Sequence, residues 1–360
     1  MSYKDFEMAA AGHTGIMTDE GESLFIKPVL KQELDFYNTI KKETSNENSL
    51  LKSNAENRGV LPLNKWIPKY IGSMSKTSNV SKEDLEKMGE LANTPMQLNN
   101  ENKNCISEPQ YIVLENLLNG YKTPNVMDIK LGRILYDDSA SIDKKNRLIK
   151  VSSETTSGSL GFRICGMKLA NQCESNYNLF RSSEFCYNNT NTYISVNKTF
   201  GRRLKTPVEI RDSLNLFFSN HLMGEAYTTN LLKMFNKRIE ALIDTLENTK
   251  SKFISSSILL IFESNIDRIK QHGLDDELID SDYDIISYLE ESCDVDQAME
   301  IEGEMIDIED IKGGISLSKL KLVDFSHAVI GKNTNTGVDS NTIDGLKSLN
   351  DVFLQLIKAI

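Results

Sequence analysis

Two kinds of apolar pattern alternate along this chain of 360 residues. Runs of strand length, such as Tyr111 to Leu114, are separated by segments in which apolar residues recur every three to four positions, as from Leu231 to Leu246. The first pattern is typical of buried strands and the second of amphipathic helices. Their mixture predicts a fold of class α+β, in which sheets and helices share the core.

The same patterns give the order of the expected elements. Strands are predicted at residues 24–28, 111–114, 160–169, 192–196, 253–263 and 319–325, and helices at 32–40, 141–150, 208–222, 229–248 and 343–356. Residues 41–60 and 74–108 are rich in Ser, Asn, Lys and Glu with little periodicity, so we predict loops or disordered insertions there. Between them, residues 63–72 contain the single tryptophan, Trp66, and are expected to form a packed strand or turn.

The net charge is unevenly distributed along the chain. There are 41 Lys and Arg against 52 Asp and Glu, a formal charge of −11, which disfavours a general binder of polyanions. Residues 275–310, however, contain sixteen acidic residues and no Lys or Arg, and without them the charge would be +5. We therefore expect a mildly basic body and an acidic insert that is a solvated, disordered loop.

Cysteine usage and hydropathy bear on the cellular compartment. The five cysteines are odd in number, widely spaced and form no Cys-x-x-Cys pair, which favours reduced thiols inside a cell. The first twenty residues have no apolar core, and the longest apolar runs are far too short to span a bilayer. The sequence therefore predicts neither a signal peptide nor a transmembrane helix.

The most specific motif lies at residues 124–132, which read Pro-Asn-Val-Met-Asp-Ile-Lys-Leu-Gly, a P-x-x-x-D-x-K-x-G pattern. Asp128 and Lys130 are two positions apart, so on an extended segment they face the same side. Phosphoryl transfer suits such a pair, because one group can orient the attacking hydroxyl while the other offsets charge on the moving phosphate. The motif thus favours a phosphotransferase.

Further motifs occur in an order that is familiar from one family. Ser255 to Leu259 reads Ser-Ser-Ser-Ile-Leu, and Leu322 to Ala328 reads Leu-Val-Asp-Phe-Ser-His-Ala. Supporting matches lie at residues 11–15, 25–28, 32–37, 114–117, 161–167 and 201–202. Together the motifs span nearly the whole chain and resemble those of inositol polyphosphate kinases, most of all fungal multikinases, which also have an acidic insert before the D-F-x-H motif. Ile258, where the family pattern has leucine, is a conservative departure.

The resemblance implies a two-lobed inositol polyphosphate kinase fold, distantly like that of protein kinases, with ATP between the lobes. The N-terminal, ATP-binding lobe would comprise residues 1–117 together with the two polar insertions. The C-terminal, catalytic lobe would comprise residues 118–360. Within it, we expect an inositol-phosphate-binding segment at about 133–170 and the acidic insert at 275–310.

The same resemblance implies roles for residues on the ATP side. Lys27 would pair with ATP phosphates, and Glu33 would hold it in place as a helix glutamate does in kinases. Backbone groups of Glu115 and Leu117 would meet the adenine. Asp324 would bind the Mg²⁺ that bridges the phosphates.

The transferred phosphate would meet a second set of residues. Ser257 would lie close to the metal, since hard oxygen ligands suit Mg²⁺. Asp128 and Lys130 would contact the ribose, the attacking hydroxyl and the transferred phosphate, and the sequence leaves open which atom belongs to which residue.

An inositol phosphate carries several phosphates on a small ring, so its site needs a dense cluster of cationic donors. Residues 141–170 contain six cations against two acids, and they follow the D-x-K motif directly, as the inositol-binding segment of the family does. His327 matches a family histidine that touches substrate phosphate. The candidate substrate contacts are Lys130, Lys144, Lys145, Arg147, Lys150, Arg163, Lys168 and His327.

Each of these assignments has a plainer alternative. The charges at residues 144–150 could be a solvated helix face, and Lys27 a surface lysine at the end of a strand. Asp324 could cap a turn, His327 could be a satisfied core histidine, and the serines at 255–257 could be strand residues only.

The leading hypothesis is an ATP- and Mg²⁺-dependent kinase that phosphorylates inositol 1,4,5-trisphosphate and then inositol tetrakisphosphate. Alternatives within this chemistry are a single-position trisphosphate 3-kinase or a hexakisphosphate kinase. An alternative of another class is a scaffold, because fungal multikinases associate with transcription regulators of arginine metabolism and residues 275–310 form a polyanion. The resemblance further implies a nuclear and cytoplasmic protein, with a lipid inositide head group as a further possible ligand.

Overall fold

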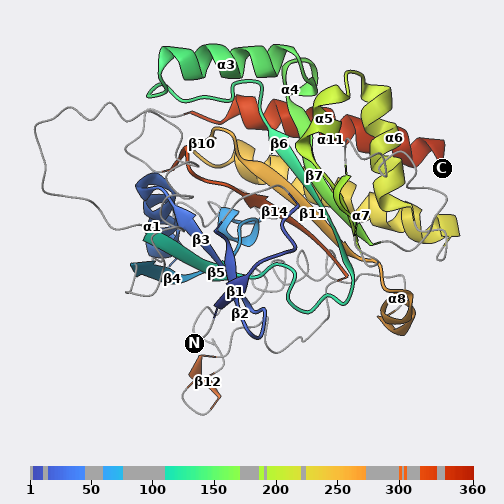
Figure 1. Cartoon of the computed structure of the whole chain (residues 1–360), viewed down its shortest axis with the longest axis horizontal. Coiled ribbons are helices and arrows are strands. Elements are labelled where there is room, and N and C mark those ends of the chain that lie inside the picture. The colour runs from blue at the N-terminus through green and yellow to red at the C-terminus, as the bar shows by residue number, and fades with distance from the viewer. Residues whose placement is uncertain are drawn as a thin grey trace, which may run out of the picture.

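The computed structural model describes residues 3–10, 15–44, 60–75, 110–170, 186–189, 193–219, 224–272, 300–301, 304–305, 317–330 and 337–360. Within them the chain forms a five-stranded and a six-stranded sheet, with most of the helices beside the larger sheet (Figure 1). This mixture confirms the predicted α+β class. The connection between the two sheets contains the predicted lobe boundary at residue 117, which stays a prediction.

The smaller sheet has the order β1-β2-β3-β5-β4 and is antiparallel throughout. Its strands are β1 (Tyr3–Asp5), β2 (Met17–Asp19), β3 (Leu24–Val29), β5 (Gln110–Glu115) and β4 (Tyr70–Ser75). Helix α1 (Lys31–Thr44) follows β3 and buries Leu34, Tyr37 and Ile40, which lie on one face because they are three positions apart. Glu33, beside Leu34 in the first turn, is also buried, so the helix brings a carboxylate into the interior.

The larger sheet has the order β14-β11-β6-β7-β9-β8 and is antiparallel as well. Its strands are β14 (Ser318–Val323), β11 (Ser257–Glu263), β6 (Pro124–Leu131), β7 (Phe162–Ala170), β9 (Tyr193–Val196) and β8 (Cys186–Asn189). Successive residues of a strand point to opposite faces. On β11, Ile258, Leu260 and Phe262 belong to the main core, whereas Leu259 and Ile261 line a pocket on the other face.

Most of the helices pack on the core face of this sheet. They are α4 (Thr156–Leu160), α5 (Lys198–Arg203), α6 (Pro207–Phe218), α7 (Gly224–Glu247) and α11 (Ser340–Ala359). Helix α6 starts with a capping box between Thr206 and Glu209, and Pro207 occupies its first turn. Helix α3 (Ile142–Ser153) runs along the edge of the molecule, and α8 (Ile266–His272) follows β11 (Figure 1). None of the helices in the described residues combines the length and the apolar composition that a membrane span requires.

The segment around the single tryptophan joins the two halves of the chain. A short 3₁₀ helix, η1 (Leu63–Lys65), precedes Trp66, whose indole N–H donates to the hydroxyl of Thr245 on α7 at 2.8 Å. The Trp66 carbonyl accepts from the N–H of Leu322 on β14 at 2.6 Å. Residues 63–72 thus contain both a turn and, from Tyr70, a strand, as expected.

The structure differs from the predicted elements in several places, and short helices such as α4, α5 and α8 were not predicted. The strand expected at 253–263 is two strands, because Ser255 adopts φ +60° and turns the chain between β10 (Ser251–Phe253) and β11. Strand β10 pairs with β15 (Ala328–Ile330), which the apolar pattern does not reveal. The predicted insertions are shorter than expected at their edges, since residues 41–44 are helical and 74–75 belong to β4.

Residues 45–59 and 76–108 of the two polar insertions lie outside the described residues. Of the acidic insert, the description covers only a small hairpin, β12 (Glu300–Ile301) with β13 (Glu304–Met305).

Candidate active site

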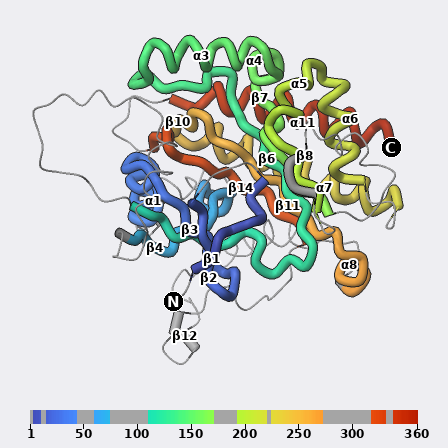
Figure 2. Tube along the Cα trace, in the orientation of Figure 1, coloured from blue at the N-terminus to red at the C-terminus, as the bar shows by residue number. Residues whose placement is uncertain are grey.

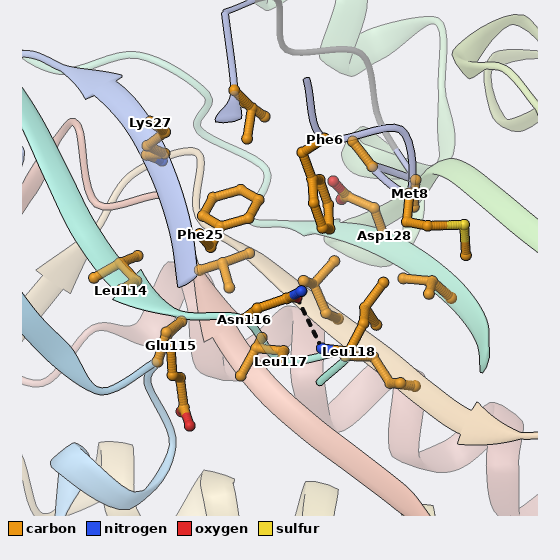
Figure 3. A pocket seen from close by; sticks show the side chains of 18 of the residues that line it. Phe6, Met8, Phe25, Lys27, Leu114, Glu115, Asn116, Leu117, Leu118 and Asp128 are labelled. Atoms are coloured by element: carbon orange, nitrogen blue, oxygen red, sulfur yellow. Dashed lines mark hydrogen bonds between the residues drawn. The ribbon is translucent and has the colours of Figure 1, made fainter. Parts of the chain in front are cut away.

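A pocket opens on the face of the larger sheet that points away from its helices, and residues of both sheets line it (Figure 3). Its apolar lining comes from β3, β5, β6, β11 and β14 and the segment after β5. The main apolar side chains are Phe25, Leu117, Val126, Leu259, Ile261 and Val323. The charged residues are few, and three of them are Lys27, Asp128 and Asp324. An apolar slot with a few charges suits a ligand that has a flat ring and a charged tail.

Lys27 lies between two carboxylates. Its Nζ is 2.7 Å from Glu33 Oε1 and 3.1 Å from Asp324 Oδ1, and the three side chains are only 12%, 2% and 21% exposed. Burial opposes the charge of the lysine, but the fields of Asp324 and Glu33 outweigh it and raise the pKa of Lys27 above its ordinary value. Strand β3, helix α1 and the end of β14 therefore meet at one charged cluster, which the sequence predicted only through the resemblance.

Glu33 also fixes the turn that follows Asp324. Its carboxylate accepts from the Phe325 N–H at 3.3 Å and from the Ser326 hydroxyl at 3.0 Å. The Phe325 ring stacks on Phe36 of α1, with 4.2 Å between the centroids. Asp324 itself has φ +66°, an uncommon conformation for a residue with a side chain. The turn thus holds the Asp324 carboxylate at the pocket against a local backbone preference.

Residues 115–118 form the inner edge of the pocket. The Glu115 carboxylate turns away from the pocket, as Figure 3 shows, and accepts from the Lys69 N–H at 3.0 Å. The Asn116 side chain donates to Glu22 O and accepts from the Leu118 N–H, which fixes the path of the backbone. At Glu115 and Leu117, therefore, a ligand in the pocket can contact backbone groups but not the Glu115 carboxylate.

The D-x-K motif lies beside the serine motif. In the sheet, Ser257 on β11 is the register partner of both Lys130 on β6 and Val323 on β14. Ser257 shares the pocket face of β11 with Leu259, because the two are two positions apart. The left-handed turn at Ser255, before β11, places its carbonyl where it accepts from Lys130 Nζ at 2.6 Å.

The residues predicted to hold a metal fit a hard cation. The Ser257 hydroxyl is fully buried and, within the described structure, has no hydrogen-bond partner. A buried orphan hydroxyl is costly, and a cation ligated by its oxygen would remove that cost. Asp324, which directly follows Val323, supplies the carboxylate. The described residues contain no group of three His, Cys, Asp or Glu side chains able to hold a metal, so other oxygens would have to complete the shell.

Four of the predicted substrate cations lie together on α3. Ser141 caps this helix, and none of its residues is buried, so the side chains of Lys144, Lys145, Arg147 and Lys150 are solvated to differing degrees. Lys145 donates to Asp138 O at 2.9 Å, and Lys150 is 3.8 Å from Glu154 with 73% of its side chain exposed. The cluster is an exposed basic face, which fits both a polyanion site and the plainer alternative of a solvated helix.

The other two cations of the predicted cluster are buried in β7. Arg163 pairs in register with Lys130 and donates to the Ser157 hydroxyl at 2.9 Å. Lys168 reaches in another direction and donates to the carbonyl of Glu7, with Met8 Sδ at 3.8 Å. The six cations therefore do not form one cluster, because Lys168 is engaged by the N-terminal segment.

That N-terminal segment, residues 6–10, is a part of the pocket that the sequence analysis missed. Phe6 stacks edge-on against Phe25, with 5.1 Å between the centroids, and Met8 lines the pocket beside them (Figure 3). The segment crosses the larger sheet so closely that a side chain at Gly166 would collide with the Ala10 carbonyl. Figure 2 shows this N-terminal stretch running across the strands of the larger sheet. The only signal in the sequence was its position just before the predicted motif at residues 11–15.

His327 lies between the turn that contains Asp324 and the segment that leads to α3. Its Nδ1 is 2.5 Å from Asp137 Oδ2. Asp137 was not among the predicted site residues, because nothing in its local pattern distinguishes it from Asp138.

Comparisons with known proteins point to one family. The model of the inositol polyphosphate kinase family matches residues 111–354. The inositol polyphosphate multikinase of Saccharomyces cerevisiae is 35% identical over 98% of this chain and 98% of its own length, and that of Schizosaccharomyces pombe is 29% identical over 99% of each. A crystal structure of the inositol phosphate multikinase Ipk2 of S. cerevisiae, in complex with ADP and Mn²⁺, matches with a TM-score of 0.63 and 31% identity over 92% of this chain and 98% of that one.

The two relatives match nearly the whole chain, and the family model matches its larger part from residue 111 onward. They confirm the family indicated by the sequence and the inositol polyphosphate kinase fold that it implied. The chain therefore belongs to the inositol polyphosphate kinase family, and it is a kinase.

Proposed function

We propose that this kinase transfers the γ-phosphate of Mg-ATP to hydroxyls of inositol 1,4,5-trisphosphate and then of inositol tetrakisphosphate. The observation that supports this most is the register of the sheet, in which Ser257 pairs with Lys130 on one side and, on the other, with Val323, the residue before Asp324. The likeness to two proteins named multikinases along their full length favours more than one acceptor hydroxyl.

ATP would bind with its base in the apolar slot and its phosphates toward Lys27. In this proposal the Glu115 carbonyl and the Leu117 N–H meet the adenine edge, since the side chain of Glu115 is turned away. Lys27, held by Glu33, lies against the phosphates as a fixed positive charge. Asp128, also in the pocket, contacts the ribose or the attacking hydroxyl.

Asp324 and Ser257 would hold the divalent metal. A metal bound there supplies charge neutralisation for the phosphates and brings them to one geometry. Among the relatives, the solved structure of Ipk2 contains ADP with Mn²⁺, and Mg²⁺ is the ion we propose for this chain.

The substrate hydroxyl attacks the γ-phosphate directly, so no nucleophile from the protein is needed. Lys130 donates to the phosphate as charge moves onto its oxygens, and catalysis is positioning plus electrostatic stabilisation. The cations of α3 and the buried Arg163 attract the phosphates of the inositol ring, and His327 contacts one of them. We call α3 together with residues 132–141 and His327 the acceptor side, and the pocket with Lys27, Glu33 and Asp324 the nucleotide side.

The test is to incubate the purified protein with Mg-ATP and inositol 1,4,5-trisphosphate and to separate the products. We expect tetrakis- and pentakisphosphates, and none with Lys130→Ala. A single tetrakisphosphate would instead indicate the trisphosphate 3-kinase, and conversion of the hexakisphosphate to pyrophosphates would indicate a hexakisphosphate kinase. Full activity of Lys130→Ala would contradict the proposed mechanism.

A second role as a scaffold rests on the acidic insert alone. A polyanion of sixteen acidic residues can bind basic partners, and we propose transcription regulators of arginine metabolism as such partners, with the protein in the nucleus and the cytoplasm. Deleting residues 275–310 should leave kinase activity unchanged and weaken capture of those regulators. Unchanged capture would remove the scaffold proposal without affecting the kinase.

A further inference from the structure

Asp137 lies against the histidine of the Asp-Phe-Ser-His motif, although the two residues are far apart in the sequence. The Oδ2 to Nδ1 distance is 2.5 Å, and the side chains are 17% and 23% exposed. The two atoms are in close polar contact, although their geometry is not that of an aligned hydrogen bond in the described structure. The pair joins the segment that leads into α3 to the turn that contains Asp324.

The carboxylate of Asp137 is itself oriented. Its other oxygen, Oδ1, accepts from the Ser139 hydroxyl at 2.7 Å, which leaves Oδ2 for the histidine. Burial alone would raise the pKa of Asp137, but the Ser139 hydrogen bond and the histidine outweigh it and lower that pKa. The group is therefore a carboxylate at neutral pH.

The backbone on which Asp137 stands is fastened from two sides. Asn341 at the start of α11 accepts from the N–H groups of Arg133 and Ile134, at 2.8 and 2.9 Å. The Ser255 hydroxyl donates to the Leu135 carbonyl at 3.0 Å. Ser255 is also the residue whose carbonyl accepts from Lys130. The segment is thus held in register with the D-x-K motif, and the position of the Asp137 carboxylate is a property of the fold.

The backbone of the histidine is fixed equally well. Glu33 holds the two residues before it, and the Ala328 N–H closes a turn onto the Phe325 carbonyl at 3.0 Å. With its backbone held and its Nδ1 edge beside a carboxylate, the imidazole keeps one orientation. The nitrogen that remains for a ligand is Nε2.

We infer that Asp137 is a positioning residue for the acceptor: its carboxylate holds the Nδ1 edge of His327, so that Nε2 is presented to a phosphate of the inositol ring. This inference rests on the proposed function, because it assigns the role of an acceptor contact to His327. Orienting a donor before the ligand arrives lowers the entropy cost of binding, as do carboxylates that contact the other ring nitrogen of metal-binding histidines.

The first test replaces the carboxylate by an amide of the same shape. In Asp137→Asn, we expect the KM for inositol 1,4,5-trisphosphate to rise about five- to tenfold while the KM for ATP changes by less than about twofold, since the nucleotide side is untouched. The control is Asp351→Asn, which removes the same charge from an exposed residue of α11, outside the acceptor side, and should leave both constants unchanged. Equal changes in both KM values, or a lowered Tm, would mean that Asp137 only supports the fold.

The second test is a double-mutant cycle. His327→Gln should raise the acceptor KM by itself, and adding Asp137→Asn should then change it by less than about twofold, because the group that the carboxylate positions is gone. If the two effects multiply in full, Asp137 acts independently of the histidine and the inference is overturned. If His327→Gln has no effect on the acceptor KM, the proposed contact of His327 is wrong and the inference with it. Failure of the proposed function itself would be visible separately, as a wild-type protein that does not phosphorylate the trisphosphate.

Discussion

On the nucleotide side the charged groups are largely buried and form ion pairs with one another, whereas on the acceptor side the cations of α3 are exposed to solvent. Lys27, Glu33 and Asp324 are at most 21% exposed and belong to one network that crosses three elements. Lys150, by comparison, is 73% exposed, and its only described ion-pair partner is Glu154 at 3.8 Å. The first region has a fixed geometry before any ligand binds, and the second has a high density of charge with little fixed geometry.

This difference indicates how each side tolerates change. In a buried network, removing one member leaves the others as uncompensated charges in a medium of low dielectric, so the loss is large. On a solvated helix, each cation adds a modest, screened attraction, and the loss of one is small. His327 and Asp137 resemble the nucleotide side, since they are about as enclosed as Asp324 and are held by the fold.

The largest effect should follow from Asp324→Asn. The variant keeps the shape of the side chain but loses the charge that would hold the metal and that pairs with Lys27, so we expect kcat to fall about a thousandfold or more. Steady-state transfer to inositol 1,4,5-trisphosphate at saturating Mg-ATP measures it. Asp344→Asn, at an exposed position of α11, is the control and should be neutral. Activity within about tenfold of wild type would show that Asp324 only caps its turn.

Glu33→Gln should have the next largest effect. Lys27 would keep Asp324 as its only described carboxylate partner, and the turn at Phe325 and Ser326 would lose a charged hydrogen-bond acceptor. We expect kcat/KM for ATP to fall about 10- to 100-fold and the free energy of unfolding to fall by roughly 2 to 4 kcal/mol. Kinetics and urea denaturation give the two values. Asp35→Asn, on the exposed face of the same helix, should change neither. If Glu33→Gln lowered the free energy of unfolding but left kcat/KM for ATP unchanged, the ion pair would stabilise the fold without contributing to nucleotide binding.

The sequence predicted the parts of the fold that depend on local pattern. The strand of Lys27 and the helix of Glu33 are where the apolar pattern indicated them, whereas the strand of the D-x-K motif, β6, was not among the predicted strands. The single strand predicted at 253–263 was wrong, because Ser255 adopts a left-handed conformation and ends one strand before the next begins. A serine gives no signal in the sequence for that conformation. Local pattern reports burial and not the sign of a backbone dihedral.

The candidate site was predictable only as far as its motifs reach. The resemblance named Lys27 and Asp324, and the structure brings them to 3.1 Å. It could not indicate Asp137, whose distinction is a contact with a residue far away in the chain. Nor could a count of cations show that Lys168 turns toward Glu7, because the direction of a strand side chain depends on which segment covers that face. Both features are tertiary contacts, which no window of sequence contains.

Lys168→Met tests this last point and should have a moderate effect. The variant keeps the length of the side chain but loses the donor that ties Glu7, and with it residues 6–10, over the pocket. Burial already lowers the pKa of this lysine, so removing its charge costs the fold little. We expect the KM for ATP to rise about three- to tenfold and the KM for the inositol phosphate to stay constant. Lys252→Met, on the exposed side of β10, is the control. A rise in the inositol phosphate KM alone would restore Lys168 to the acceptor side, as the sequence predicted.

The smallest effect should come from a single cation of α3. Because the Lys150 ammonium is largely solvated, Lys150→Gln should raise the KM for inositol 1,4,5-trisphosphate by only about two- to threefold. The effect should shrink further when salt is raised, since a longer-range attraction is screened first. Lys358→Gln, an exposed cation at the end of α11, should be neutral at every salt concentration. If Lys150→Gln instead cost a hundredfold independently of salt, the ammonium would be a fixed, desolvated contact like Lys27, and the two sides of the site would not differ in the way their exposure indicates.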